Sequence, residues 1–327
     1  QMTEIIAEIG INHNGLFWKA MQMIRDAAAA GCKTVKFQCH VTADEYHPSA
    51  RSIIPANSDE DILTMMERCS FDEGQERDLK TYAETLGMEY LCTPFSRAAA
   101  DRLERLGVRR YKIGSGECSN IPLIEHIAAF GKPIILSTGM NDFDMIDLAV
   151  EAVGDCPLTL MHCVSEYPTP YEHVNLRRML ALQERYNVPV GLSDHSLGIY
   201  TALAAVALGA SVVEKHFTSS LQWPGADVPI SLTPDQLGEL IRGADAIERA
   251  LEYLDHPTDG ELCTAHFANA SVVSLVDIPA GAVLTRENIW VRRPGTGISA
   301  RHYKNMLGLK ASRDIPADTL LRIDMLK

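Results

Sequence analysis

The chain has 327 residues, of which 46% are hydrophobic and 22% are charged, so it is long enough for one large core and a smaller second domain. Its formal net charge of -13 argues against a general binder of nucleic-acid backbones and favours a small substrate over a polymeric one. No run approaches the ~18 apolar residues of a membrane-spanning helix, and the N-terminal residues lack a signal-peptide pattern, so we expect a cytoplasmic protein.

Short β-like runs alternate with helical patterns over about the first 250 residues, which is typical of repeated strand–helix units. A polar stretch from His40 to about Asn57 interrupts this alternation, and an irregular segment of that length is usually functional. The expected strands are residues 4–9, 34–38, 89–93, 110–113, 133–137, 158–162, 189–193 and 211–216. The expected helices are residues 18–30, 71–86, 96–106, 122–129, 142–153, 200–208 and 234–250.

Eight strands that alternate with helices in about 250 residues match the size of a (β/α)8 TIM barrel. A doubly wound open sheet is the alternative, but no G-x-G-x-x-G motif follows the first strand. We therefore predict a barrel domain of residues 1–254, a linker of residues 255–270 and a small domain of short strands and turns over residues 271–327. Because Ile278-Pro-Ala-Gly and Ile315-Pro-Ala-Asp recur 37 positions apart, the small domain is a candidate for an internal pseudo-repeat.

The eight cysteines include no C-x-x-C pair, and most of them lie within apolar runs such as Leu158 to Cys163. This pattern favours free thiols in a reduced protein over a disulfide framework.

Polar side chains stand where the predicted strands end. In a parallel barrel these ends converge on one mouth, and buried polar groups cost energy unless they are paired. The densest example is the segment from Tyr111 to Glu117, which combines a lysine, a serine, two glycines and a carboxylate. The polar groups at strand ends are Glu8, Lys36, Gln38, Thr93, Lys112, Ser115, Glu117, Ser137, Thr138, His162, Ser193, Asp194, His195 and His216.

Two lysines at strand ends, Lys36 and Lys112, would form an anion pocket with nearby hydroxyls and with the backbone of Gly114 and Gly116. The hydroxyls are those of Thr93, Ser115 and Ser193. One alternative is a solvated lysine, and another is an amine that forms a Schiff base with a carbonyl substrate. An aldolase of that kind needs one lysine and no metal.

Two histidines, His195 and His216, end neighbouring strands of the predicted barrel. Neutral imidazoles placed in this way can hold a divalent ion such as manganese, zinc or cobalt and leave positions open for water and substrate. Carboxylates and amides are candidates for holding a polyhydroxylated acceptor or moving its protons: Glu8, Glu117, Asp227, Asn12 and Asn57.

Together these motifs resemble the sialic acid synthase family, which condenses phosphoenolpyruvate with an amino sugar. The resemblance runs over essentially the whole chain, and its C-terminal part, Arg293 to Gly297, resembles the antifreeze-like (SAF) domain of that family. The other matching phrases span residues 7–15, 35–38, 92–95, 111–117, 136–140, 167–170, 191–195 and 215–218.

The resemblance implies a TIM barrel fused to an SAF domain that is exchanged between the subunits of a homodimer. It implies the synthesis of N-acetylneuraminate and phosphate from N-acetylmannosamine, phosphoenolpyruvate and water. It places phosphoenolpyruvate at Lys36, Gln38, Thr93, Lys112, Ser115, Ser165 and Ser193. It places the sugar at Glu8, Asn57, Tyr167, Asp227, Phe267 and Arg293. It places a divalent metal, most simply Mn2+ with Mg2+ or Co2+ as alternatives, at His195 and His216, and the expected catalytic groups are Glu8, Glu117, Lys112 and Asp227.

Other acceptors remain open within this class. A diacetamido-trideoxyhexose would give legionaminic or pseudaminic acid, and a 6-phosphorylated sugar would call for an extra basic cluster. Because Arg51 is the clear cation between His40 and Asn57, we favour an unphosphorylated acceptor. A non-catalytic carbohydrate-binding or ice-binding protein is the alternative from a different class, but it does not explain two histidines and two lysines on one rim.

Overall fold

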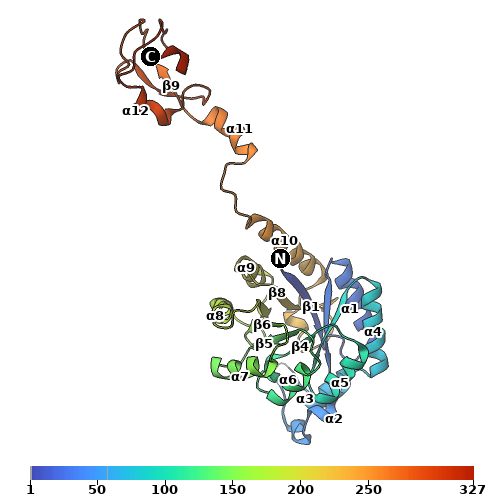
Figure 1. The fold of residues 1–327 in the computed structure, drawn as a ribbon. Coiled ribbons are helices and arrows are strands. Elements are labelled where there is room, and N and C mark those ends of the chain that lie inside the picture. Colours follow the sequence, from blue (N-terminus) through green and yellow to red (C-terminus); the bar gives the residue numbers. More distant parts are fainter. Residues whose placement is uncertain (1, 57) are drawn as a thin grey trace. The chain divides into compact units, whose positions relative to one another are not determined.

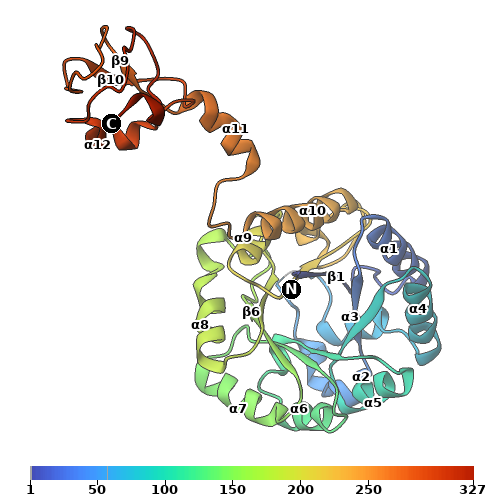
Figure 2. The same cartoon turned by 45° about the horizontal axis from the view of Figure 1, so that its top comes forward.

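The structure is a computed structural model that describes residues 2–56 and 58–327, and the chain divides into two compact units after Glu252. The first unit is a barrel of parallel strands surrounded by helices (Figures 1 and 2). Its strands in the described residues are β1 (Glu4–Gly10), β2 (Thr34–Cys39), β3 (Glu89–Pro94), β4 (Tyr111–Ile113), β5 (Ile134–Ser137), β6 (Leu158–Cys163), β7 (Val190–Asp194) and β8 (Val212–His216).

The order of hydrogen-bonded strands runs β3-β2-β1-β8-β7-β6-β5-β4, and every pair in it is parallel. The two end strands of this order, β3 and β4, also lie next to each other, so the sheet curls into a nearly closed barrel. The strands are almost continuously buried, as parallel strands covered by helices must be. The predicted (β/α)8 barrel is confirmed, and the open doubly wound sheet is excluded.

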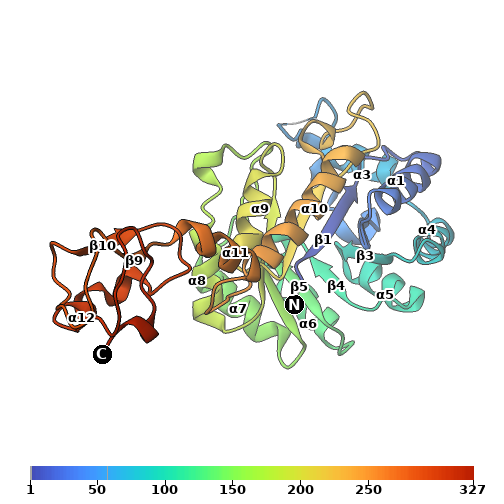
Figure 3. The same cartoon turned by 90° about the horizontal axis from the view of Figure 1, so that it is seen from above.

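Helices form the outer ring of the barrel, with α10 lying between α9 and α1 (Figure 3). The sequence pattern did not predict α8, which follows β6. The polar stretch after β2 holds α2 (Thr42–Glu45) and a 3-10 turn (Pro48–Ser52), and α3 (Ile62–Cys69) follows it. The ring consists of α1 (Phe17–Ala29), α4 (Glu73–Thr85), α5 (Arg97–Leu106), α6 (Ile121–Ala128), α7 (Phe143–Val153), α8 (Arg177–Tyr186), α9 (Tyr200–Ala207) and α10 (Pro234–Ala250).

Side chains fill the inside of the barrel in layers, because alternate residues of each strand point inward. A lower layer at the N-terminal ends of the strands is ionic, with the Arg110 guanidinium bonded to both Glu4 and Glu89. The upper layer, at the C-terminal ends, is polar and forms the candidate site. Between them lies an apolar layer of Ile6, Leu91, Ile135, Met161 and Val212.

The second unit contains a short antiparallel pair, β9 (Ser271–Ser274) and β10 (Ile289–Arg292), with α12 (Tyr303–Met306). The two repeated phrases of the sequence pair directly, since Ile278 and Ile315 exchange both backbone hydrogen bonds, at 2.8 and 2.9 Å. The aspartates before them act reciprocally: Asp314 accepts from Ala280 N–H and Asp277 accepts from Ala317 N–H, each at 2.7 Å. The suspected pseudo-repeat is therefore a local two-fold pairing.

The predicted linker is not wholly irregular, because α11 (Asp259–Ala268) falls within it. The sequence contains a signal for the start of this helix. Thr258 and Glu261 form a reciprocal capping box, which is the T-x-x-E signature of a helix N-terminus. All eight cysteines are free thiols, as expected. Among the residues described, no helix combines the length and the apolar character needed to cross a membrane.

Candidate active site

A cavity of about 320 Å³ lies at the C-terminal ends of the barrel strands. Its walls come from strands that are distant in sequence, because a closed barrel brings all these ends to one mouth. Asn57 lies outside the described residues. The cavity brings together the predicted residues Glu8, Lys36, Gln38, Thr93, Lys112, Ser115, Ser165, Tyr167, Ser193, His195, His216 and Asp227.

Two lysines and two carboxylates form an ion cluster in the floor of the cavity. Lys36 Nζ lies 2.9 Å from Glu8 Oε2 and 3.6 Å from Glu214 Oε1, and it also donates to Thr93 Oγ1 at 3.1 Å. Lys112 Nζ lies 3.4 Å from Glu214 Oε2. The charges balance without a ligand, but Lys112 has a single carboxylate within ion-pair distance among the described residues.

Burial and neighbouring charges shift the pKa values of these groups in opposite directions. Burial raises the pKa of Glu8, and burial lowers the pKa of Lys112. Although burial opposes the charge of Lys36, the carboxylates of Glu214 and Glu8 raise its pKa. Lys112 is therefore the ammonium group with most to gain from an anion in the cavity.

Hydroxyl groups form a cradle beside Lys112. Gly139 N–H donates to Ser115 Oγ at 3.0 Å, which fixes the position of this hydroxyl beside the cavity. A Cβ atom on Gly139 would lie 2.7 Å from Ser165 Oγ and 2.8 Å from Ser115 Oγ, so only glycine lets the two serines converge. Ser137 Oγ is buried without a hydrogen-bond partner among the described residues. Such a set of hydroxyls suits the oxygens of a phosphate or carboxylate.

The two histidines lie together at the other side of the mouth, with ring centroids 5.4 Å apart. His195 Nδ1 donates to Val164 O at 2.8 Å, which orients the ring and leaves Nε2 as the nitrogen with a lone pair. Tyr167 stacks on His195 with a centroid distance of 4.2 Å. Burial lowers the pKa of His216 to about 4, so this imidazole is neutral near pH 7.

These histidines fit a divalent ion that keeps open coordination positions. His216 Nδ1 is buried without a hydrogen-bond partner among the described residues, and Asp227 Oδ2 lies 3.9 Å from it. Within the described ranges there is no group of three or more His, Cys, Asp or Glu side chains arranged to hold a metal. A bound ion would therefore need water or substrate oxygens to complete its coordination.

Asn12, predicted as a sugar-holding candidate, instead fixes the loop that carries Asp227. Its side chain is fully buried, and its Nδ2 donates to Phe217 O and to Ser231 Oγ, both at 2.8 Å. Ser231 Oγ in turn donates to Asp227 O at 2.7 Å. The expectation for Asn12 was wrong because its side chain is bonded within this loop region and does not line the cavity.

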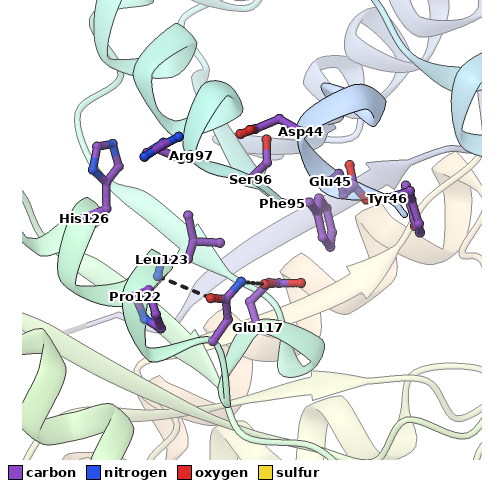
Figure 4. Close-up of a pocket in the computed structure, with 11 residues that line it drawn as sticks. Asp44, Glu45, Tyr46, Phe95, Ser96, Arg97, Glu117, Pro122, Leu123 and His126 are labelled. Carbon is purple, nitrogen blue, oxygen red and sulfur yellow. Dashed lines mark hydrogen bonds between the residues drawn. The ribbon is translucent and has the colours of Figure 1, made fainter. Parts of the chain in front are cut away.

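Glu117, a predicted catalytic residue, does not line the mouth cavity. It lines a neighbouring pocket of about 630 Å³ together with Glu45 and Tyr46 (Figure 4). Its Oε2 accepts from Asn120 Nδ2 at 2.6 Å, and its pKa is raised by burial and then by the charge of Glu45. The 3-10 turn Ser115–Glu117 separates the two faces: Ser115 faces the mouth and Glu117 faces the side pocket.

Phe267 and Arg293, the predicted closing residues, belong to the second unit. Gly295 N–H donates to His266 O at 2.9 Å, so the loop after Arg293 lies against the C-terminal end of α11. A Cβ atom on Gly295 would lie 2.8 Å from Ala265 O, which explains the glycine. Phe267, in the last turn of α11, is 66% exposed. The two predicted residues therefore belong to adjoining segments of this unit.

Comparison with known proteins agrees with this architecture. Residues 23–255 match the model of the NeuB family, and residues 269–327 match that of the SAF domain. The chain belongs to the NeuB family. It is 36% identical to the N,N'-diacetyllegionaminic acid synthase of Campylobacter jejuni over 332 residues, covering 98% of this chain and 99% of that protein. It is 35% identical to human N-acetylneuraminate-9-phosphate synthase over 300 residues, covering 88% and 82%.

A solved relative has the same fold. The crystal structure of N-acetylneuraminic acid synthetase from Leptospira borgpetersenii serovar Hardjo-bovis in complex with citrate superposes with a TM-score of 0.74 at 31% identity. The match covers 81% of this chain and 90% of that chain. This NeuB-family chain is thus an enzyme of the sialic acid synthase type with a C-terminal SAF domain.

Sequence reasoning did not assign Glu214, which lies at the centre of the ion cluster of this NeuB-family site. Alternation along β8 is the signal that could have found it: Glu214 and His216 are two residues apart, so both point into the barrel. The same rule applies to Cys163, whose Sγ lies 3.8 Å from His195 Nδ1. Ser137 was recognised as a strand end but was not assigned to the anion pocket.

Proposed function

We propose that this enzyme condenses phosphoenolpyruvate with an unphosphorylated N-acetylated amino sugar, with N-acetylmannosamine as the acceptor and N-acetylneuraminate and phosphate as the products. The observation that carries the proposal is the pairing, in one cavity, of Lys36 and Lys112 beside a serine cradle with two adjacent histidines. The first set suits a doubly anionic substrate, and the second suits activation of a carbonyl group.

In this proposal, phosphoenolpyruvate binds with its anionic groups at Lys112, Lys36 and the cradle of Ser115, Ser137 and Ser165. The ammonium groups exchange part of their contact with Glu8 and Glu214 for contact with the substrate. Because this exchange replaces one set of ion pairs with another, it avoids leaving a buried charge alone.

The sugar binds on the side of His195, His216 and Asp227, where Tyr167 covers the pocket. A divalent ion, expected to be Mn2+, would supply Lewis-acid polarisation of the sugar aldehyde when bound by the two histidines. C3 of phosphoenolpyruvate then forms a bond to the aldehyde carbon, and the aldehyde oxygen takes up a proton. Water adds at C2, and phosphate leaves with cleavage of the C–O bond. The residues hold the two reacting carbons together in one cavity.

The charges around the cavity support an unphosphorylated acceptor in this proposal. Among the described residues that line it, Lys36 and Lys112 are the lysines or arginines, and both are taken by phosphoenolpyruvate in this proposal. Arg51 is exposed and bonded to Thr64 and Glu67, at 3.0 and 2.8 Å. A diacetamido-trideoxyhexose is the second candidate acceptor, favoured by the similarity to a legionaminic acid synthase over nearly the whole chain.

The test mixes the protein, Mn2+ and phosphoenolpyruvate with a panel of acceptor sugars and measures released phosphate and product mass. We expect release with N-acetylmannosamine and a product of the mass of N-acetylneuraminate. Release only with the diacetamido sugar would move the proposal to legionaminic acid synthesis, and no release with any acceptor would reject it. Borohydride trapping should add no mass at Lys36 or Lys112, whereas a trapped adduct would favour the Schiff-base alternative.

We further propose that the enzyme is a homodimer in which Phe267 and Arg293 of one chain close the sugar site of the other. Its support is the resemblance of the Arg293 loop to the SAF domain of the family. Arg293→Ala should weaken sugar use more than phosphoenolpyruvate binding. Mixing Arg293→Ala with Lys112→Met should restore about a quarter of wild-type activity, because half of the dimers then contain one intact site. No recovery on mixing would contradict the exchange.

A further inference from the structure

We propose that His40, just beyond the end of β2, is a positioning residue for the site of the proposed function. It holds the side-chain amide of Gln38 in one orientation, so that an N–H group rather than the carbonyl oxygen faces Glu8 and the cavity. His40 does not line the cavity, and it therefore acts through Gln38.

A chain of side-chain hydrogen bonds leads from the neighbouring pocket into the cavity. His40 Nδ1 lies 2.8 Å from Glu45 Oε2 and 3.0 Å from Glu45 Oε1. His40 Nε2 lies 3.0 Å from Gln38 Oε1. Gln38 Nε2 donates to Glu8 Oε1 at 3.2 Å, and Glu8 Oε2 pairs with Lys36 Nζ at 2.9 Å. One continuous path thus joins Glu45 to the ion cluster.

The direction of each hydrogen bond follows from which of the neighbouring groups can donate and which can only accept. The Gln38 amide nitrogen donates to a carboxylate, so its oxygen is the acceptor on the His40 side. Glu45 is also an acceptor. Both ring nitrogens of His40 therefore face acceptors, and Nε2 must carry a proton because the Gln38 oxygen can only accept. Reversing the Gln38 amide would break the bonds to His40 and to Glu8 together, so the amide is locked.

This orientation sets what Gln38 offers to a substrate. A glutamine amide nitrogen has two hydrogens, and one is taken by Glu8. The other is available on the cavity side, where Gln38 forms part of the wall. The site therefore recognises an oxygen atom of the ligand at this point, such as a carbonyl or hydroxyl oxygen, and discriminates against a donor group.

Packing around His40 holds this path of hydrogen bonds in place. The side chains of His40 and Glu45 are 3% and 6% exposed, and the ring stacks on Phe95 at 4.6 Å with an interplanar angle of 12°. Figure 4 shows Glu45 and Phe95 on the same side of the neighbouring pocket. The other charged or titratable groups that face the ring are Glu76 from α4 and His13 from the loop after β1.

The backbone also leaves room for the Gln38–Glu8 bond. Gly10 has a φ of +52°, and a Cβ atom there would lie 3.1 Å from Glu8 Oε1 and 3.3 Å from Gln38 Nε2. A side chain at this position would press on both partners of the bond. The glycine and His40 therefore both affect the Gln38–Glu8 contact.

A double-mutant cycle tests whether His40 acts through Gln38. His40→Phe keeps a ring against Phe95 and removes both N–H groups, and Gln38→Leu removes the amide. We expect each single change to lower kcat/KM for phosphoenolpyruvate, the substrate placed at Gln38, about 10-fold, and the double variant to be no worse than Gln38→Leu alone. Losses that multiply in the double variant would overturn the proposal. His126→Phe is the matched control, because it removes a histidine–carboxylate pair of 2.7 Å to Asp101, and its kcat/KM should not change.

A second measurement does not depend on turnover. The 15N spectrum of the His40 ring, identified by its loss in His40→Phe, should show Nε2 protonated, since this nitrogen faces the Gln38 oxygen. An Nε2 without a proton would overturn the proposal. If wild-type protein released no phosphate while Nε2 was still protonated, the proposed function would fail and the hydrogen-bond assignment would stand.

Discussion

The upper and lower layers of the barrel interior both contain ion clusters, the upper one buried and the lower one partly exposed. They differ in how completely their polar atoms are hydrogen-bonded. In the lower layer, Arg110 donates to Glu89 at 2.9 and 3.1 Å and to both oxygens of Glu4, and Thr34 donates to Glu4 at 2.6 Å. In the upper layer, one oxygen of Glu8 and one of Glu214 are buried without a hydrogen-bond partner among the described residues, although each lies beside a lysine.

The difference follows from the chemistry of the cations. A guanidinium is a rigid planar fork that saturates two carboxylates at once, whereas an ammonium is a compact charge that can change partners without a fixed plane. The lower cluster therefore suits a permanent structural role. The upper cluster can release one contact and accept a substrate anion. Incomplete hydrogen bonding beside a cavity thus distinguishes the candidate site from the lower ion cluster, and single substitutions can test the distinction.

The largest effect should come from the histidine pair. His216→Ala should lower metal-dependent phosphate release by more than about 1,000-fold, because one of two protein ligands of the expected ion is lost. Calorimetric titration of Mn2+ should show weaker binding in the variant. Turnover by wild-type protein that is unchanged by chelation and by re-addition of metal would contradict the metal assignment.

The next largest loss of activity should come from replacing a lysine of the upper layer. Lys112→Met should lower kcat/KM for phosphoenolpyruvate about 100-fold, since one charge-assisted contact to an anion contributes about 1.5–3 kcal/mol. Thermal stability should change little, because this lysine is held by one carboxylate within ion-pair distance among the described residues. Lys132→Met is the control: it removes a 2.6 Å pair with Glu104 outside the cavity, and its kinetics should match the wild type.

The lower layer should show the opposite pattern. Arg110→Met should lower the free energy of unfolding by about 2 kcal/mol, between the values typical of surface and buried pairs, with kcat/KM per folded molecule unchanged. Equal losses of activity and stability would contradict the separation of layers. Arg105→Met, which removes an exposed pair with Glu73, should cost less than about 0.5 kcal/mol.

The same variant carries a pH dependence with a defined sign. Burial opposes the charge of Glu4, but Arg110 outweighs it and lowers the Glu4 pKa below the ordinary value of 4.5. A depressed carboxylate pKa stabilises the fold above the unfolded pKa, and this contribution is lost as pH falls through the folded pKa. The difference in unfolding free energy between wild type and Arg110→Met should therefore be largest near neutral pH and shrink below about pH 4.5. A difference that grows on acidification would contradict the pairing.

The smallest effect should come from the loop that carries Asp227. Ser231→Ala removes the bridge between Asn12 and Asp227 O and should raise the KM of the acceptor about 5-fold, the equivalent of one neutral hydrogen bond. The KM of phosphoenolpyruvate should be unchanged. Ser312→Ala, which removes a hydroxyl-to-carbonyl bond of 2.9 Å in the second unit, should change neither value.

The barrel could be predicted from sequence because its strands are short apolar runs that end in polar residues. The missed helix α8 follows an irregular segment after β6 and has no side-chain cap, so its start carries no local signal. The convergence of Lys36, Lys112 and the histidines was predictable for the same reason as the fold: strand ends meet at one mouth.

The positions of side chains on loops could not be predicted from the sequence. Glu117 is two residues from Ser115, yet a 3-10 turn sends the two side chains to different pockets. The side chain of Asn12 donates to the backbone of a loop more than 200 residues away in sequence. Contacts of this kind depend on tertiary placement and leave no periodic pattern. Glu214 is different, because strand alternation was sufficient to place it inside.

The central claim is that the upper layer supports condensation with cleavage of the C–O bond of phosphoenolpyruvate. The most direct test uses phosphoenolpyruvate labelled with 18O at the oxygen that bridges C2 and phosphorus, mixed with enzyme, Mn2+ and N-acetylmannosamine. Mass spectrometry of the released phosphate should find the label there, because water supplies the new oxygen at C2. Label retained in the carbon product would show cleavage of the P–O bond and contradict the account.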